Sequence, residues 1–325
     1  MSLYYVNECF LLCASIFFLY RTYKLALTTV SLLIIHLLQT HTSEYVYLPK
    51  RNKSKMHTFY QTIHNFQKIQ TNKCSPFASS IVLALFSYLI KAQSGEYDGK
   101  TNFEIIKNIL NKKMILRKIT IPEGLSIHQV CELLNQCEFL DGAIDNVPHE
   151  GSILPETYFY TRNTKAQVLL TKMSEAFTNV TNQLWNNTDQ RRWKNKNDWI
   201  IFASIIQKEA KDEEEMGLIA SVFINRIEHN MYLDSDPCVI YGITNGKSHI
   251  NRVLKQHIQI NSDYNTYKKK GLPKTPICNP GLHALIISLN PPKSEYKFFH
   301  HRQINTVFSK SLNDHINSLK NIQNT

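Results

Sequence analysis

The stretch Trp199-Ile-Ile-Phe-Ala-Ser-Ile-Ile-Gln-Lys-Glu209 decides how the rest of the chain is interpreted. No Gly or Pro interrupts it, and Asp198 in front of it is a good N-cap, so it predicts a helix. In that helix Glu209 shares one face with Phe202 and 205–206. A carboxyl group among apolar side chains has a raised pKa and holds a proton near neutral pH, as a general acid must. The alternative is that Glu209 only marks where a buried helix reaches solvent.

The segments around this helix extend the pattern on both sides. Downstream, an acidic turn at 211–215 precedes a second predicted helix at 216–230. Asp236 and Pro237 then predict a turn that leads into an apolar strand. Upstream, 164–185 predicts a further helical stretch, which a polar and basic linker separates from Trp199.

A smaller unit is predicted at 114–140. A strand at 115–121 is followed by the turn Pro122-Glu-Gly124, and Ser126 caps a short amphipathic helix. The order strand, turn and capped helix resembles half of a LysM-like module, a fold type that docks on glycan. Small units of this pattern also occur as plain structure, so both interpretations stay open.

The residues before this unit predict further helices and a membrane anchor. An apolar run at 79–90 is too short to span a membrane, and a turn is predicted at 93–97 and a helix at 103–110, capped by Asn102. Near the N-terminus, 9–20 and 25–38 are apolar, and 21–24 separates them. We expect one uncleaved anchor at about 23–40, with Arg21 and Lys24 at its cytoplasmic end. The contribution of 9–20 to the membrane stays open.

Composition narrows the function classes. The 325 residues are 43% hydrophobic, which is enough for two or three modest domains with real cores. The net charge of +11 fits nucleic acid, anionic lipid or an acidic polymer, but no recognition helix or RNA-binding motif is present. The seven cysteines include no C-x-x-C pair and the histidines are scattered, so we predict no metal and no cofactor. Cys131 and Cys137 are predicted as packed or partly exposed thiols.

Blocks over about 110 residues carry a family resemblance. They are ASIIQKE at 203–209, IASVFINR at 219–226, DSDPCVIYG at 234–242, YNTY at 264–267, GLP at 271–273, PICNPG at 276–281, AL at 284–285, LNP at 289–291 and FS at 308–309. Weaker matches are LPETY at 154–158 and GEY at 95–97. In this order the blocks resemble the MltG-type (YceG-like) endolytic murein transglycosylases.

The resemblance implies an enzyme of the bacterial inner membrane. It would have one N-terminal anchor and a body outside the cytoplasm that cuts nascent peptidoglycan strands internally, limiting their elongation. The bond cut would be the β-1,4 link from N-acetylmuramic acid to N-acetylglucosamine, leaving a 1,6-anhydro-muramyl end. By position, Glu209 is the catalytic acid and base. One carboxyl can serve both steps when the substrate's own 6-hydroxyl is the nucleophile.

Other residues are candidates for binding or support. Glu215 matches an acidic family position and either tunes Glu209 or is solvated. Asp236 either orders its turn or touches sugar. Three aromatic and amide side chains suit a sugar cleft or a core, namely Tyr264, Asn265 and Tyr267. The amide of Asn279 either holds an N-acetyl group or bonds its own backbone.

Two positions depart from the family pattern. Lys274 and Thr275 stand where the family has Pro followed by Gly or Thr, and Thr306 stands where the family has His. These departures leave room for a catalytically weak glycan-binding or scaffold protein of the cell-wall machinery. A basic binder of nucleic acid or lipid is a second alternative, suggested by charge alone.

The predicted architecture is α+β. It consists of an N-terminal segment at 1–22, the anchor at 23–40, a first LysM-like region at 41–112, a second LysM-like unit at 113–148 and a catalytic domain at 149–325. Expected partners are peptidoglycan strands and the membrane, with no nucleic acid, and the resemblance also suggests peptidoglycan synthases.

Overall fold

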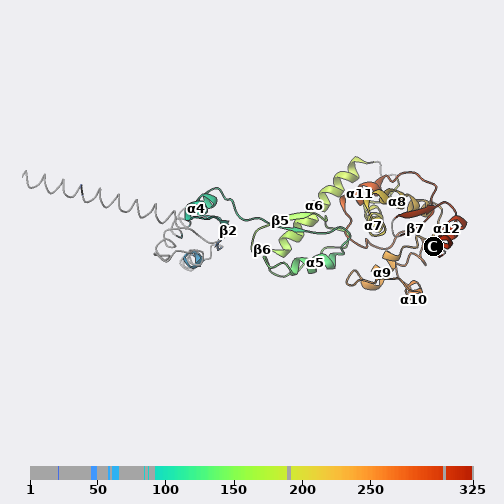
Figure 1. Cartoon of the computed structure of the whole chain (residues 1–325), viewed down its shortest axis with the longest axis horizontal. Helices are drawn as coiled ribbons and strands as arrows, with labels where there is room; N and C mark the ends of the chain where they lie inside the picture. The colour runs from blue at the N-terminus through green and yellow to red at the C-terminus, as the bar shows by residue number, and fades with distance from the viewer. Residues whose placement is uncertain are drawn as a thin grey trace, which may run out of the picture. The chain divides into compact units, whose positions relative to one another are not determined.

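The computed structural model describes residues 21, 45–49, 58, 61–65, 84, 87, 92–188, 192–302 and 305–323. The chain forms two compact units, Met1–Arg117 and Lys118–Thr325 (Figure 1). The predicted anchor at 23–40 lies outside the described residues, as does most of the run at 79–90. Within the described part, no helix combines the length and apolarity that crossing a membrane requires.

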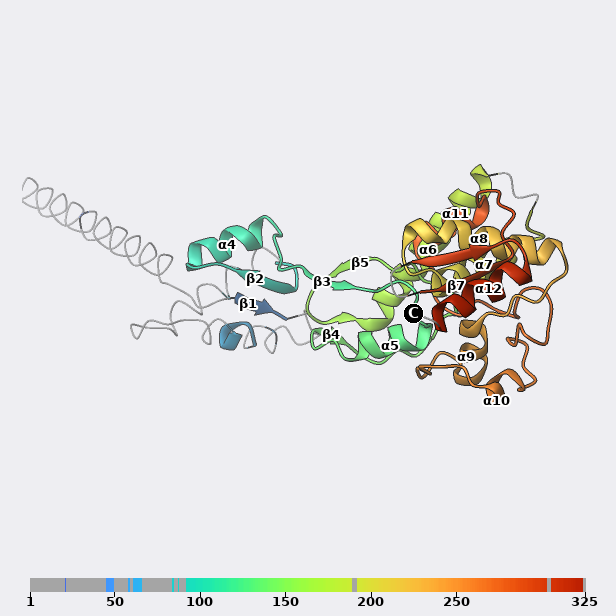
Figure 2. The ribbon, with the colours of Figure 1, turned by 45° about the vertical axis from the view of Figure 1, so that its right-hand side comes forward.

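The first unit pairs two strands that are distant in sequence. β1 (Tyr45–Leu48) runs antiparallel to β2 (Gly95–Asp98), and α4 (Asn102–Leu110) packs beside β2 (Figure 2). The predicted turn at 93–97 is therefore wrong from Gly95 onward, because a partner strand about fifty residues earlier supplies the backbone hydrogen bonds. The cap of α4 is Thr101, whose hydroxyl accepts from the Glu104 N–H, and Asn102 is its first residue.

The second unit begins with the predicted strand and helix. β3 (Arg117–Thr120) pairs with β5 (Thr157–Tyr160), and α5 (Ile127–Asn135) follows β3. Ser126 caps α5 as predicted, in a capping box with Gln129. Two short parallel strands and a long helix complete this part, namely β4 (Leu140–Asp141), β6 (Thr164–Lys165) and α6 (Ala166–Asn187). Its core joins α5 to α6 through apolar side chains such as Val130, Leu134, Leu169 and Met173.

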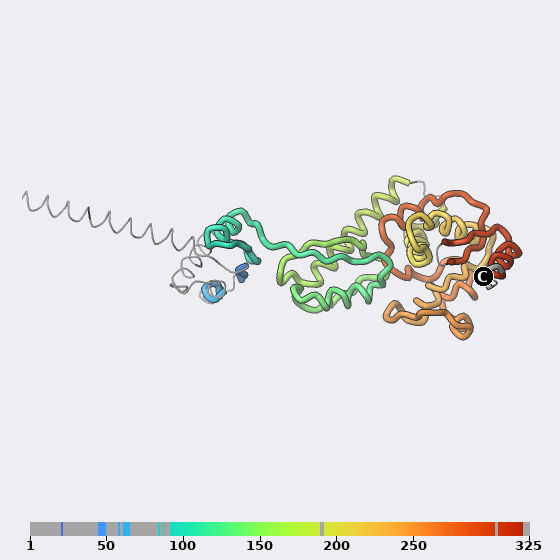
Figure 3. Tube along the Cα trace, viewed as in Figure 1, coloured from blue at the N-terminus to red at the C-terminus, as the bar shows by residue number. Residues whose placement is uncertain are grey.

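α7 (Lys196–Glu209) is the central helix of the remainder of the unit. It contacts α8 (Glu213–Glu228), α9 (Asp236–Thr244) and α11 (Leu282–Leu289). Figure 3 traces the backbone of this part from yellow to orange. Trp199 is fully buried, and its indole N–H donates to Leu285 O at 3.1 Å and Ser288 Oγ at 2.8 Å. The outer elements are α10 (Lys255–Ile258), the antiparallel hairpin of β7 (Phe298–His301) and β8 (Thr306–Ser309), and α12 (Leu312–Gln323).

The mixed α+β class is confirmed, with two corrections in this part. α7 begins at Lys196, because Asn195 rather than Asp198 is the N-cap and accepts from the Asp198 N–H at 2.8 Å. The predicted apolar strand after Asp236 is a helix, α9. A short apolar run does not separate the two states, and a proline in the first turn suits a helix because its missing N–H would have no intrahelical partner.

Candidate active site

Glu209 is the last residue of α7, and its carboxyl faces the start of α9. The Ser235 hydroxyl donates to Glu209 Oε1 at 2.6 Å. Burial raises the pKa of Glu209 to about 7; the Ser235 hydrogen bond and the Arg226 charge oppose the shift, and the Asp236 charge adds to it. The residue as a whole keeps partial solvent access. A carboxyl that is protonated near neutrality, on a residue with partial solvent access, can act as an acid first and a base afterwards.

A buried arginine fixes the segment that carries Ser235. Arg226 on α8 donates to Leu233 O at 2.6 Å and to Lys297 O at 2.7 Å, and it lies 3.4 Å from a carboxylate oxygen of Asp234. Ser235 is fully buried, and its backbone N–H bonds Thr266 Oγ1 at 2.9 Å. The hydroxyl is therefore held in place against Glu209 by contacts on both sides of the segment.

Asp236 is brought next to Glu209, and Tyr267 is brought to Asp236. Asp236 is exposed at the first turn of α9, and the Tyr267 hydroxyl donates to its Oδ1 at 2.7 Å. The electrostatic effect of Asp236 on the pKa of Glu209 places a second carboxylate at the site. Both side chains are accessible, so they are available to a ligand that reaches Glu209.

Tyr264 and Asn265 support the neighbouring loop. The Tyr264 ring packs on Tyr241 with 5.0 Å between centroids, and its hydroxyl lies 2.8 Å from Thr275 Oγ1. The buried Asn265 amide donates to Ile258 O and Ile260 O, at 2.8 and 2.7 Å. The amide of Asn265 thus bonds backbone, while the ring of Tyr264 is partly accessible.

Glu215 approaches the site from the first turn of α8. Its carboxyl lies 3.9 Å from His301 Nδ1 on β7, and no hydrogen bond reaches its buried Oε2 from the described residues. His301 also hydrogen-bonds to the backbone of Glu209, and its Nδ1 lies 2.7 Å from Thr306 Oγ1. Burial is the largest of the causes that lower the pKa of His301. Thr306 is therefore paired across the hairpin with a histidine.

Asn279 is placed away from solvent, at the junction between the β-α unit and the central helices. Its Oδ1 accepts from the Ile153 N–H at 3.2 Å, and its Nδ2 donates to Leu125 O at 3.0 Å and to Glu150 Oε1 at 3.3 Å. Its backbone carbonyl accepts from the Gly124 N–H at 3.0 Å. Burial raises the pKa of Glu150 to about 7, and bonds from the Ile127 and Gly151 backbone and the Tyr241 side chain oppose the shift. The side chain of Asn279 is fully engaged by the protein.

A cavity of about 410 Å³ opens beside this junction. One wall is the β-α unit with Gly124 and Ser126, and the other is the loop after α9 with Gly246 and Arg252. The Ser126 hydroxyl donates to Gly246 O at 2.7 Å, which ties the walls together at one point. Gly246 has φ of +72°, and a Cβ there would lie 2.5 Å from that of Ser126, so this close approach requires glycine.

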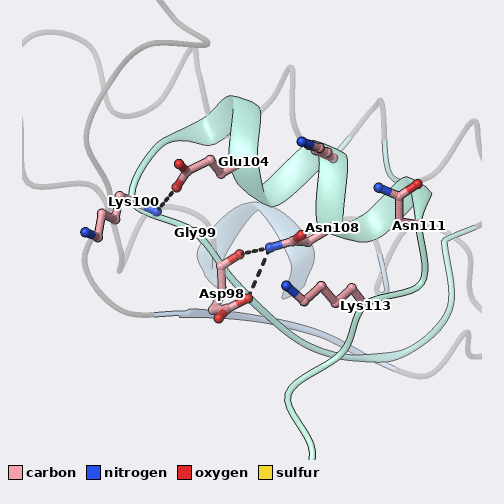
Figure 4. A pocket seen from close by; sticks show the side chains of 8 residues that line it. Asp98, Gly99, Lys100, Glu104, Asn108, Asn111 and Lys113 are labelled. Carbon is pink, nitrogen blue, oxygen red and sulfur yellow. Dashed lines mark hydrogen bonds between the residues drawn. The ribbon is translucent and has the colours of Figure 1, made fainter.

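A second hollow, of about 770 Å³, lies in the first unit beside α4 (Figure 4). Hydrogen bonds link several of the residues that line it. Asn108 donates to the carbonyl and carboxylate oxygens of Asp98, and the Lys100 N–H donates to Glu104. Nothing in this hollow resembles a pair of catalytic groups, so the candidate site is the one around Glu209.

Sequence reasoning missed several residues of the site. Ser235 stands inside the DSDP block, yet nothing in its neighbours shows that it reaches Glu209. Arg226 had a usable signal, because an arginine on the apolar side of a predicted helix needs buried partners. His301 and Glu150 carry no local signal, since their partners are distant in sequence.

The hydrogen bond from Ser235 leads to a prediction about pH. Because this bond lowers the pKa of Glu209 while burial raises it, Ser235→Ala should raise that pKa further. If the protonated carboxyl starts the reaction, the alkaline limb of the pH–rate profile moves to higher pH by a few tenths of a unit to about one unit. Rates measured between pH 5.5 and 9 test this. Thr178→Ala is the control, because Thr178 is an exposed hydroxyl residue on α6 away from the site. An alkaline limb that stays at the same pH in Ser235→Ala would contradict the assignment.

Comparisons with known proteins match most of the chain to one family. Residues 54–321 match the model of the YceG-like family. A Bacillus subtilis (strain 168) protein named endolytic murein transglycosylase is 34% identical over 280 residues, which cover 71% of this chain and 74% of the relative. A Streptococcus pneumoniae R6 protein of the same name is 27% identical, and the match covers 57% of this chain and 40% of that relative. The fold is similar to a crystal structure of a putative yceG-like protein from Listeria monocytogenes, with a TM-score of 0.54, 23% identity, and coverage of 84% of this chain and 97% of that one.

Proposed function

The chain belongs to the YceG-like family, and on that premise we propose that it is a murein transglycosylase that cuts peptidoglycan strands internally, with Glu209 as its acid and base. The expectation of an enzyme is confirmed at the level of the family by the names of its curated relatives. The observation that carries the proposal is the Glu209 carboxyl, whose burial and contacts give a pKa of about 7.

The proposed reaction breaks the β-1,4 bond between C1 of N-acetylmuramic acid and O4 of N-acetylglucosamine. Protonated Glu209 gives its proton to the leaving O4, and the carboxylate then accepts the proton of the muramyl 6-hydroxyl as O6 bonds C1. The product is a 1,6-anhydro-muramyl end, and Glu209 returns to its starting state. One carboxyl of intermediate pKa serves both proton transfers, because the nucleophile belongs to the substrate.

Hydrolysis is a second candidate function, favoured by the position of Asp236. Glycoside hydrolases use a second carboxylate to activate water or to attack the anomeric carbon. Asp236 is accessible and close enough to Glu209 to raise its pKa. Its engagement by the Tyr267 hydroxyl favours a positioning role instead, since that hydrogen bond occupies Oδ1 and holds the carboxylate in one orientation.

Product analysis separates these two reactions. Mass spectrometry of digested glycan strands distinguishes an anhydro end from a reducing end, which is heavier by one water. For the transglycosylase, Asp236→Asn should lower activity only a few-fold at pH 7.5, because it lowers the pKa of Glu209 and so the protonated fraction. Reducing ends, together with a loss of about 100-fold or more in Asp236→Asn, would favour hydrolysis. Absence of any cleavage, with retained binding to sacculi, would favour the glycan-binding scaffold.

We also propose that the protein acts outside the cytoplasm, held at the bacterial inner membrane by one span at about 23–40. The support is the apolar run with Arg21 and Lys24 beside it, together with a substrate that lies outside the cytoplasm. Protease added to spheroplasts should digest Lys118–Thr325 while a cytosolic marker stays intact. Protection of this unit until detergent is added would contradict the proposal.

A further inference from the structure

The cavity between the β-α unit and the loop after α9 has an unbalanced charge. Lys208 and Arg252 line it, and Asp236 is the one carboxylate among the described residues that do so. The Tyr267 hydroxyl already bonds Asp236, and Arg252 is exposed and makes no ion pair within the described part of the chain. Lys208 uses one donor on Gly124 O at 3.3 Å, which leaves two of its three N–H groups.

This pocket shares Asp236 with the surroundings of Glu209. Lys208 precedes Glu209 on α7, and Asp236 is the carboxylate whose charge raises the pKa of Glu209. The volume of about 410 Å³ falls in the range of pockets that hold small organic ligands. Apolar surface from Ile240 and Ile277 lies beside the cationic groups, so the pocket suits a ligand with both short aliphatic parts and a carboxylate.

We propose that this pocket binds a free carboxylate of the peptide stem on the muramic acid residue whose anomeric carbon faces Glu209, with Arg252 as its main cationic contact. The inference rests on the proposed function, which places muramic acid next to the acid. A stem attached to that sugar presents small aliphatic side chains and carboxylates, which match the apolar and cationic lining of the pocket. Arg252 then determines the preference for strands whose stems keep their charge.

The test compares glycan strands with free stem carboxylates and the same strands after methyl esterification of those carboxylates. Both strand preparations are freed of phosphate polymers, so that a phosphate group cannot bind Arg252 in place of the carboxylate. The wild-type protein should prefer the free form about tenfold in kcat/KM, which is the scale of one well-placed charged contact. Arg252→Glu should abolish or reverse this preference, and Arg252→Lys should retain most of it. Lys247→Glu is the matched control, because Lys247 is exposed on the same loop and does not line the pocket.

A binding measurement keeps this inference separate from the reaction. Calorimetry with the inactive Glu209→Gln protein compares a soluble muramyl peptide with its methyl ester. The free peptide should bind more tightly than its ester, and this difference should disappear in the double variant Glu209→Gln/Arg252→Glu. That result supports the pocket whether or not the wild-type protein cuts strands. If it is obtained and no strand is cut, only the proposed function fails. The proposed pocket would be wrong if the two ligands bind equally well, even if strands are cut. It would also be wrong if Lys247→Glu and Arg252→Glu reduce the preference for the free carboxylate equally.

Discussion

Glu209→Gln is expected to reduce cleavage of polymeric peptidoglycan by about a thousandfold or more. General acid–base catalysis contributes about 10² to 10⁴ in rate, and here one group performs both proton transfers. The amide keeps the size of the carboxyl and its Oε1 can still accept from Ser235, so geometry is retained while the transferable proton is lost. The measurement is the rate of release of new glycan ends from purified sacculi.

The stability of the same variant provides an internal control. A carboxyl whose folded pKa is raised from 4.5 to about 7 is bound to its proton more tightly in the folded state than in the unfolded chain. Its contribution to stability is therefore complete below pH 4.5 and is lost as pH rises through 7. Glu209→Gln has no such loss, so at pH 8 it should be more stable than the wild type, by an amount on the order of 2 kcal/mol. Urea unfolding at pH 4.5 and pH 8 measures the difference.

The outcome that contradicts the assignment is specific. If Glu209→Gln retains activity, the acid is elsewhere. If it loses activity and is also less stable at pH 8, the residue is structural. Glu138→Gln is the matched control, because Glu138 is an exposed carboxylate in a turn, and the substitution should leave both activity and stability unchanged.

Glu209, the proposed acid, could be singled out from the sequence because its signal is local. The run 199–209 has no helix breaker, and helical spacing places Glu209 on the buried side. α7 confirms this, with Phe202, Ile205 and Ile206 all buried. The blocks from 203 to 309 then gave the family, and the family match over 54–321 confirms it.

The partners of the acid were not predictable, because tertiary contacts decide them. Ser235 reaches Glu209 from 26 residues away, and the bond exists because Arg226 and Thr266 hold the intervening segment. The apolar run after Asp236 forms the helix α9, although its composition also fits a strand. Local pattern fixes which residues are buried far better than it fixes which side chains meet.

The contacts of Asn279 were also not predictable from the sequence, and they lead to a prediction of a large loss of stability. The sequence left two roles for its amide, a contact to an N-acetyl group or a bond to its own backbone. In the structure the buried amide instead joins Ile153, Leu125 and Glu150, at a junction that no local pattern indicates. Asn279→Ala should therefore destabilise the protein by about 3 kcal/mol, because it leaves the buried Ile153 N–H without its acceptor and opens a small cavity.

Urea unfolding of Lys118–Thr325 within the full chain measures this change, with the far-ultraviolet signal as readout. Asn261→Ala is the matched control; Asn261 is exposed, and its substitution should change stability by less than about 0.5 kcal/mol.

A second variant, Asn279→Asp, keeps the acceptor for the Ile153 N–H but sets a second carboxyl against Glu150 and Leu125 O. It should therefore also destabilise the protein. The loss should be larger above pH 7, where Glu150 ionises. If Asn279→Ala is instead as stable as the wild type and only raises KM for glycan, the amide binds sugar. In that case the Asn279 side chain would not be needed to hold the β-α unit against the central helices.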